Sequence, residues 1–359
     1  MSLRERWILW RNARLADPGF QRWATRFPLT RPIARRRAGK LFDLVAGFVY
    51  SQVVAAAVET GLLPFLQVRP RTAAEVAAHT GLPVAGAERL LHAASALGLV
   101  EMLDDRFALG SDGAALLGNP GVAEMVAHHR FLYADLADPV ALLRRRGGSL
   151  AGYWAYGEAD PASGAAGHEP VAAYSALMAA SQPGIAAAVL DSYDVRRHRR
   201  LLDVGGGQGV FAAAALDRAP GLAAAVFDLP AVVARIADPR VERIGGSFVA
   251  DELPRGFDLI SLIRVVHDHD DAVVAALLAK AHAALAPGGT LLLAEPMAVT
   301  PGAAGVGAYF DLYLWAMGSG EPRSAARLTT LLTDAGFAKV REHPTAIPAL
   351  VRSLTATKT

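Results

Sequence analysis

The sequence predicts an α/β fold, with a mostly parallel sheet in its C-terminal half and a mainly helical, winged-helix-like N-terminal half. After Arg200, continuous apolar runs such as "RLLDV", "FDLISLI" and "GTLLLAEP" alternate with helical segments, which is typical of a parallel sheet covered on both faces. Between residues 72 and 109 the pattern is helix, turn, helix and hairpin, which indicates a winged-helix-like module. The chain has 359 residues, enough for two domains.

The composition excludes several kinds of chemistry. The chain has no cysteine, so disulfides, thiolate nucleophiles and cysteine-ligated metal sites are excluded. The N-terminus lacks the pattern of a secretory signal, and we expect a cytoplasmic protein. The best candidate for a membrane span, Leu44 to Val58, is short and contains Ser51 and Gln52, so no spanning helix is predicted.

Positive charge is concentrated in the first 40 residues. They contain ten Arg and one Lys against one Glu and one Asp, a net charge of +9, whereas the whole chain carries +2. Trp7, Trp10 and Trp23 also lie there. Arg and Trp together are typical of a helix on an anionic membrane surface, which would place the protein peripherally on the inner membrane. Packing on a partner subunit is the alternative, and nucleic acid is not expected because no base-reading motif is present.

The elements of the N-terminal half can be placed in order. A helix with an apolar face begins near Leu41 and ends near Gly61. Thr72 and Glu75 form a capping box that predicts the start of the next helix. Asp104–Asp105 marks the turn of a hairpin. The sequence therefore predicts the helix–turn–helix–hairpin order of a winged-helix-like module.

DNA binding is the functional alternative for this module. Its second helix offers only Arg89 and His92 as base or phosphate contacts, and a DNA reader normally brings more positive charge. A structural or dimerising role is therefore favoured.

Residues 120–197 are predicted to be helical, with loops rich in Gly and Pro. Tyr153 and Trp154 lie in such a loop and are candidates for lining an apolar pocket, although aromatic residues beside glycines also serve as loop anchors. Met178 lies on the apolar stripe of the next helix, where a Met is more often part of the core. After residue 337, two segments, "AKVREHPTA" and "IPALVRSLTA", are predicted to close the sheet as an antiparallel pair.

A glycine-rich turn follows the first strand of the predicted sheet. "LLDVGGGQG" places Asp203 ahead of Gly205, Gly207 and Gly209, and small residues let a ligand approach the backbone. A dinucleotide site prefers G-x-G-x-x-G, and an acid beside two phosphates is repulsive, so Asp203 favours a cationic ligand. The next strand ends in Asp228, where a carboxylate usually accepts hydrogen bonds from ribose hydroxyls.

A cluster of His and Asp follows a later strand of the sheet. "RVVHDHDD" holds His267 and His269 beside three Asp, which allows a metal site or a general base. A metal site needs several converging ligands, but Asp268 and Asp270 would point away from the two His if the strand continued. No second cluster completes a shell, so no metal is predicted.

The motifs "LLDVGGGQG", "VFDLPAVV", "RVVHDHDD", "LLLAEPM" and "RSAARLTTLLTDAGF" resemble those of the plant-type S-adenosylmethionine-dependent O-methyltransferases, over residues 200–345. The whole chain resembles the architecture of this family. The resemblance implies a basic arm (1–40), a winged-helix-like dimerisation and substrate-lining domain (41–190) and a Rossmann-like methyltransferase domain (191–359). It also implies a homodimer, S-adenosyl-L-methionine as cofactor, S-adenosyl-L-homocysteine as product, no metal, and a small apolar hydroxylated acceptor.

Within this family, "RFPLTRPIARRRAGKLFDLVAGFVYSQV" is most similar to bacterial carotenoid-pathway members. That similarity implies the tertiary 1-hydroxyl of an acyclic carotenoid as the acceptor. A phenolic polyketide or a bacteriochlorophyll precursor would need much the same apolar cleft. Two other hypotheses are a winged-helix regulator that senses a ligand and a nicotinamide dehydrogenase, which Asp203 disfavours.

The resemblance assigns roles residue by residue. It makes His267 the general base and Glu295 its orienting acid. The family's second glutamate falls on Pro322, one residue after Glu321, so Glu321 is only a candidate for that role. The residues implied for cofactor binding are Asp203, Gly205, Gly207, Asp228, Leu229, Ser247, Phe248 and Arg264. Those implied for the acceptor are Met178, Tyr153 and Trp154.

Overall fold

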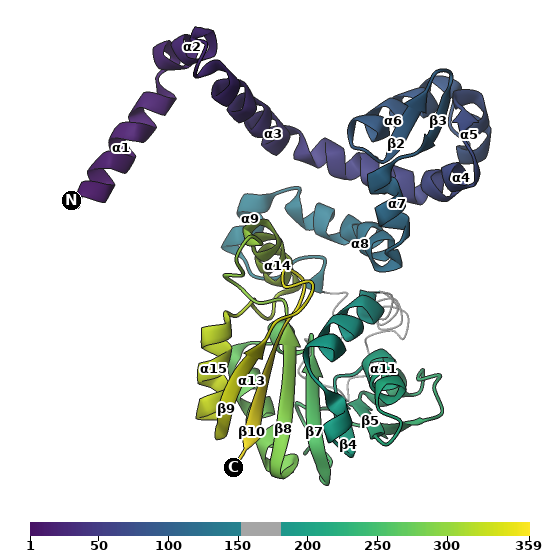
Figure 1. Ribbon diagram of the computed structural model, residues 1–359, viewed down its shortest axis with the longest axis vertical. Helices are drawn as coiled ribbons and strands as arrows, with labels where there is room; N and C mark the ends of the chain where they lie inside the picture. The colour runs from purple at the N-terminus through teal and green to yellow at the C-terminus, as the bar shows by residue number, and fades with distance from the viewer. Residues whose placement is uncertain (152–180) are drawn as a thin grey trace. The chain divides into compact units, whose positions relative to one another are not determined.

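The computed structural model describes residues 1–151 and 181–359, which form two compact units, Met1–Leu117 and Gly118–Thr359 (Figure 1). Tyr153, Trp154 and Met178 lie outside the described residues. The domain boundaries expected at residues 40 and 190 stay predictions.

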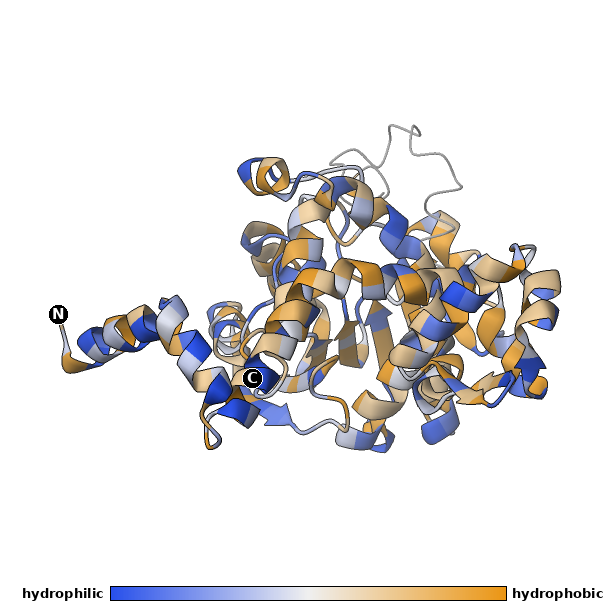
Figure 2. Ribbon diagram, turned by 90° about the horizontal axis from the view of Figure 1, so that it is seen from above, coloured by the Kyte–Doolittle hydropathy of each residue, from blue (hydrophilic) through white to orange (hydrophobic). Residues whose placement is uncertain are grey.

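The basic arm is helical. Helix α1 (Leu3–Ala16) begins with a capping box between Ser2 and Glu5. Asp17 caps α2 (Pro18–Arg26) by accepting a hydrogen bond from the backbone N–H of Phe20. Hydrophobic and hydrophilic residues alternate along these helices (Figure 2), and most of the large apolar side chains on them are exposed within the single chain.

Helix α3 (Arg31–Glu59) begins about ten residues before the helix that the sequence predicted. It is long and apolar enough to cross a membrane by length and composition alone, so the expectation that the candidate segment is too short was wrong, whereas the prediction that no helix spans a membrane stays a prediction. The Ser51 and Gln52 side chains do not interrupt it. Almost none of its apolar window is buried within the single chain, so a partner of some kind can cover its exposed apolar surface.

The rest of the first unit confirms the helix–turn–helix–hairpin order. The capping box of Thr72 and Glu75 is present at the start of α5, and Asp104 lies at the hairpin turn with a φ of 49°. Three strands form a small sheet in the order β1-β3-β2. The elements are α4 (Leu62–Val68), β1 (Arg71–Thr72), α5 (Ala73–Thr80), α6 (Val84–Ala96), β2 (Val100–Leu103), β3 (Arg106–Leu109) and α7 (Ser111–Leu117).

The second unit contains a seven-stranded sheet in the order β6-β5-β4-β7-β8-β10-β9. The first five strands in this order are parallel, and β10 pairs antiparallel with both β8 and β9. The mostly parallel Rossmann-like sheet is therefore confirmed. Its strands are β4 (Arg200–Val204), β5 (Ala223–Asp228), β6 (Val241–Gly245), β7 (Phe257–Ile263), β8 (Leu285–Glu295), β9 (Phe337–His343) and β10 (Arg352–Lys358).

Helices cover both faces of this sheet (Figure 1). Successive strand residues point to opposite faces, so Leu202 and Val204 pack in the layer that contains α13 and α15, whereas Leu201 packs in the layer that contains α11. Burial on both faces explains the continuous apolar runs of the sequence. Among the residues that the structure describes, the helices of this unit include α8 (Pro120–Leu136), α9 (Pro139–Arg144), η2 (Val195–Arg197), α11 (Val210–Arg218), α12 (Pro230–Val233), η3 (Val266–Asp268), α13 (Asp271–Ala284), α14 (Ala304–Met317) and α15 (Ala325–Asp334), and residues 181–192 are helical as well.

The strand order reverses direction between β4 and β7. From β4 the chain builds outward through β5 and β6, and it then returns to β7 and β8 on the other side. In open α/β sheets, ligands bind at the carboxyl ends of the strands where the order reverses. The turn after β4 and the loop after β7 are therefore where a site is expected.

Candidate active site

The turn after β4 uses glycines where a side chain would not fit. Gly205 has a φ of 68°, and a Cβ there would lie 2.8 Å from the side chain of Val265. Gly207 has a φ of 58°, but the space around its Cβ position is open. The backbone of this turn is thus held close to the loop after β7 on one side and is accessible on the other.

Asp228 ties this turn to the end of β5. Its two carboxylate oxygens accept hydrogen bonds from the backbone N–H groups of Gly207 (2.9 Å) and Leu229 (2.7 Å). Burial nevertheless raises the pKa of Asp228 to about 6. Three of the residues assigned to the cofactor therefore contact one another directly.

Asp203 is a buried acid that lacks a cationic neighbour among the residues that the structure describes. Its Oδ1 accepts a hydrogen bond from Ser261 Oγ (2.6 Å), while Oδ2 has no hydrogen-bond partner in those residues. Burial raises the pKa of Asp203 to about 7. A buried carboxylate is costly unless it is paired, so this position suits a ligand that carries positive charge.

The remaining predicted cofactor residues lie on two other segments. Ser247 caps a turn, since its Oγ accepts a hydrogen bond from Ala250 N (3.3 Å). Phe248 is buried and packs edge-on against the ring of His269, with centroids 5.2 Å apart. Arg264 has a φ of 59°, and its guanidinium donates a hydrogen bond to Ser181 Oγ (2.9 Å). In the part of the chain that the structure describes, no hydrogen bond or ion pair joins Ser247 or Arg264 to the glycine turn.

His267 and Glu295 are brought together at the carboxyl ends of β7 and β8. His267 Nδ1 lies 2.5 Å from Glu295 Oε2, and both side chains are buried. Glu295 Oε1 accepts hydrogen bonds from the backbone N–H groups of Val265 (3.0 Å) and Val266 (2.7 Å). The carboxylate therefore fixes both the ring and its loop. A proton held at Nδ1 leaves Nε2 as the basic nitrogen of the neutral ring.

Asp268 also contacts the ring, which the sequence analysis did not anticipate. Its Oδ1 lies 3.2 Å from His267 Nε2. The expectation that Asp268 would point away from His267 was wrong because β7 ends at Ile263 and the chain then forms the short helix η3. No periodic signal in the sequence marks this turn.

The two acids determine the pKa of His267. Burial alone lowers the pKa of an imidazole, but the Asp268 and Glu295 carboxylates together outweigh it, so the pKa of His267 is raised. Burial raises the pKa of Asp268 to about 6. A proton on this ring is therefore stabilised by carboxylates on both nitrogens.

The structure does not bring the Glu321 carboxylate to His267. The Glu321 side chain is 58% exposed, and its Oε1 lies 3.7 Å from Nε of Arg323. Its backbone N–H instead donates a hydrogen bond to the carbonyl of His267 (2.9 Å). This geometry gives the predicted catalytic role of the Glu321 carboxylate no support.

The other acids of the cluster are engaged in ion pairs. Asp270 lies 2.7 Å from Arg146, and Asp271 lies 2.7 Å from Arg323. Within residues 1–151 and 181–359, no group of three or more His, Asp or Glu could hold a metal ion.

Two family models match the chain. Residues 133–338 match the O-methyltransferase domain, and residues 42–125 match the O-methyltransferase dimerisation domain. The second match supports a homodimer, and a second copy is a suitable cover for the exposed apolar surface of α3, most of which lies in that range.

Known proteins resemble the chain over most of its length. It is 41% identical to the demethylspheroidene O-methyltransferase of Cereibacter sphaeroides, covering 94% of this chain and 92% of that protein. The same identity holds for the demethylspheroidene O-methyltransferase of Rhodobacter capsulatus, over 92% and 85%. The solved structure of CalO1, a methyltransferase in calicheamicin biosynthesis in its SAH-bound form, has a TM-score of 0.76 at 25% identity, over 90% and 98%. The chain belongs to the O-methyltransferase family.

Proposed function

We propose that this protein transfers the methyl group of S-adenosylmethionine to the tertiary 1-hydroxyl of an acyclic carotenoid. The observation that carries the proposal is the buried His267 between Glu295 and Asp268, on the loop whose Val265 lies against Gly205 of the glycine turn. A regulator that only senses a ligand has no need of a base held in this way. The carotenoid acceptor is supported by the likeness to the two demethylspheroidene O-methyltransferases.

The residues of the glycine turn fit this cofactor. S-adenosylmethionine supplies a methyl group on a sulfonium, which leaves as a neutral thioether, so no acid is needed at the leaving group. Asp203 offers a cationic ligand a buried carboxylate, one oxygen of which has no hydrogen-bond partner among residues 1–151 and 181–359. In this proposal Asp228, at the end of β5, accepts hydrogen bonds from the ribose hydroxyls, and the open space beside Gly207 supports close approach of the cofactor to the backbone.

His267 acts as the general base in this proposal. Its Nε2 takes the proton of the acceptor hydroxyl as the oxygen attacks the methyl carbon, and the two carboxylates stabilise the imidazolium that forms. A tertiary alcohol is a much weaker acid than a phenol, so proton removal must accompany the attack. A positioned base of this kind contributes roughly 10²–10⁴-fold to the rate.

A comparison of acceptors tests the proposal. Purified protein is given S-adenosylmethionine labelled in the methyl group, with demethylspheroidene in detergent micelles or a planar phenolic polyketide of similar apolarity. We expect label in the carotenoid at a kcat/KM at least about tenfold higher. Equal or greater transfer to the phenol would contradict the carotenoid acceptor and leave the methyltransferase activity intact.

The basic arm is proposed to hold the enzyme on the cytoplasmic face of an anionic membrane, where such an acceptor is dissolved. Trp7 and Trp10 on α1 and Trp23 on α2 are all about half exposed within the single chain. Trp10 and Trp23 line a pocket of about 470 Å³, together with Arg11, Arg14, Leu15 and Phe20. Indole rings beside guanidinium groups suit the boundary between phosphates and acyl chains.

Vesicle flotation tests the arm. We expect the parent to bind vesicles that contain phosphatidylglycerol, and binding to weaken with salt. The triple variant Trp7→Ala, Trp10→Ala, Trp23→Ala should bind at least about tenfold more weakly. Met102→Ala, which removes an exposed apolar side chain outside the arm, serves as the matched control. Unchanged flotation of the triple variant, or its conversion from dimer to monomer, would contradict the membrane role.

A further inference from the structure

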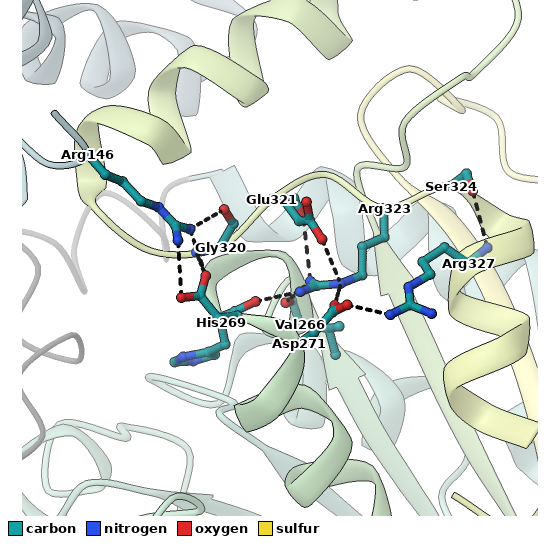
Figure 3. Close-up of polar contacts among 10 residues, drawn as sticks. Arg146, Val266, His269, Asp271, Gly320, Glu321, Arg323, Ser324 and Arg327 are labelled. Carbon is teal, nitrogen blue, oxygen red and sulfur yellow. Dashed lines mark hydrogen bonds and ion pairs between the residues drawn. The ribbon is translucent and has the colours of Figure 1, made fainter. Parts of the chain in front are cut away.

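The loop that carries His267 is held by one distant segment. Four consecutive carbonyls, from Val266 to His269, accept hydrogen bonds from side chains or backbone between Ser319 and Arg323. Arg323 donates from Nη1 to the carbonyl of residue 266 (2.9 Å) and from Nη2 to that of residue 269 (2.8 Å). The backbone N–H of Glu321 donates to the carbonyl of residue 267 (2.9 Å), and Ser319 Oγ donates to that of residue 268 (2.8 Å). Figure 3 draws several of these contacts. Each of these four carbonyls in the irregular loop therefore has a hydrogen-bond donor.

Arg323 is the centre of this arrangement. The residue is only 4% exposed, and its guanidinium donates to two loop carbonyls and, from Nε, to Asp271 Oδ1 (2.7 Å). Its own carbonyl accepts from Ala298 N (3.0 Å), which fixes the backbone of the segment. The planar fork of an arginine can hold three acceptors in this way, whereas a lysine cannot.

Gly320 makes the closest approach. It has a φ of 81°, and a Cβ at this position would lie 2.1 Å from the carbonyl oxygen of His267 and 2.8 Å from Cα of Asp268. Any side chain here would push directly on the backbone of His267 and Asp268. The tight packing of the segment against the loop therefore depends on a glycine.

Arg146, just after α9, ties the outer edge of the arrangement. Its guanidinium donates to both carboxylate oxygens of Asp270 (2.7 and 3.2 Å) and to the carbonyl of Gly320 (3.0 Å). Gly320 N donates to the same carboxylate (3.1 Å). Figure 3 shows Arg146 reaching Gly320 from the side opposite Arg323. The segment is thus fixed at both ends.

We propose that Ser319–Arg323 and Arg146, here named the loop clasp, position His267 for proton removal without touching its ring. The proposal rests on the proposed function, in which His267 is the base. It explains why Pro322 can occupy the place of a second glutamate: the segment acts on the base through the backbone of its loop. Catalytic groups must be held to within about 0.5 Å of their productive geometry, and a short helical turn after a strand cannot do this alone.

Two substitutions probe the clasp from different directions. Arg323→Gln removes the guanidinium, and Gly320→Ala inserts a methyl group against the His267 carbonyl. Arg327→Gln is the matched control, because Arg327 also pairs with Asp271 but from the exposed side and without reaching the loop. The measurements are kcat and KM with demethylspheroidene and labelled S-adenosylmethionine, cofactor affinity by calorimetry, and amide hydrogen exchange of residues 264–271.

We expect both clasp variants to lose at least about tenfold in kcat while cofactor Kd changes less than about threefold. Hydrogen exchange of the backbone amides of residues 264–271 should become faster in both variants. The low-pH limb of the plot of kcat against pH should shift. Arg323→Lys should restore part of kcat, and Arg146→Gln, at the outer edge, should lose less than Arg323→Gln. Arg327→Gln should match the parent.

Clasp variants that keep parental kcat and parental loop exchange would overturn the proposal. A loss of kcat that is fully explained by a smaller folded fraction or weaker cofactor binding would overturn it too. Hydrogen exchange needs no methyl acceptor, so it reports on the clasp even if the acceptor is wrong. If His267→Ala were fully active, the proposed function would fall, whereas a dead His267→Ala beside normal clasp variants would reject the clasp alone.

Discussion

The two acids beside the glycine turn differ sharply from the two acids beside His267. Asp203 and Asp228 are buried with no cationic partner among the described residues, and burial raises the pKa of each. Glu295 and Asp268 are equally buried but share an imidazole that can take up a proton. The base is therefore organised in advance, while the turn is completed only by what it binds. The three predictions below probe this difference.

Loss of the base should have the largest effect. We expect His267→Ala to lower kcat by roughly 10²–10⁴-fold with little change in cofactor affinity, because the glycine turn does not depend on the ring. His282→Gln, at the far end of α13, is the control. Single-turnover methyl transfer and calorimetry measure the two quantities. Unchanged turnover in His267→Ala would remove the base from the mechanism.

Asp203→Asn should separate stability from binding. An acid whose folded-state pKa is about 7 against an ordinary 3.8 binds more protons when folded, so stability falls as pH rises between these values and the full cost is present above pH 7. The amide removes that cost. We expect the free energy of unfolding without cofactor to rise by up to about 4 kcal/mol at pH 8, with little change at pH 4.

Urea titrations at the two pH values measure this, and the same variant should bind S-adenosylmethionine at least about tenfold more weakly. Asp217→Asn, at an exposed carboxylate, controls for the loss of one negative charge. If Asp203→Asn were less stable than the parent at pH 8, the Asp203 carboxylate would not destabilise the free protein.

Asp268→Asn should have the smallest effect on kcat. It should shift the pH dependence of kcat in one direction. A general base works only when neutral, so kcat falls as pH drops through the pKa of His267. Asp268 helps to raise that pKa, and its replacement should move the acid limb of kcat to lower pH. Above the limb, kcat should stay within about tenfold of the parent. A limb that stays in place or moves to higher pH would contradict the role of Asp268.

The sequence predicted what depends on burial and local capping. The parallel strands were predictable because burial on both faces leaves continuous apolar runs, and the start of α5 was predictable from Thr72 and Glu75. The start of α3 was not predicted, since its first turns carry exposed Arg residues, although Thr30 at the N-cap and Pro32 in the first turn are signals of a helix start. The pairing of His267 with Glu295 was implied by the family resemblance, and the structure accounts for it because β7 and β8 are parallel neighbours whose carboxyl ends meet at one edge of the sheet.

The rest of the site has no sequence pattern. Asp268 reaches the ring because η3 turns the chain, and a single short turn leaves no periodicity to read. The clasp joins residues about 50 positions apart through backbone carbonyls, which every residue type possesses. Pro322 showed that this segment departs from the family pattern. It did not show that the side chain of the neighbouring Arg323 is buried.

The raised pKa values of Asp203 and Asp228 have a consequence for the cell. Near pH 6 the free protein carries protons on part of these carboxyls, and in the proposed function a bound cation displaces them into the medium. Binding of the methyl donor then exchanges a bound proton for the positive charge of the donor. The apparent affinity of the protein for the donor therefore increases as the pH rises. A fall in pH would therefore weaken capture of the donor.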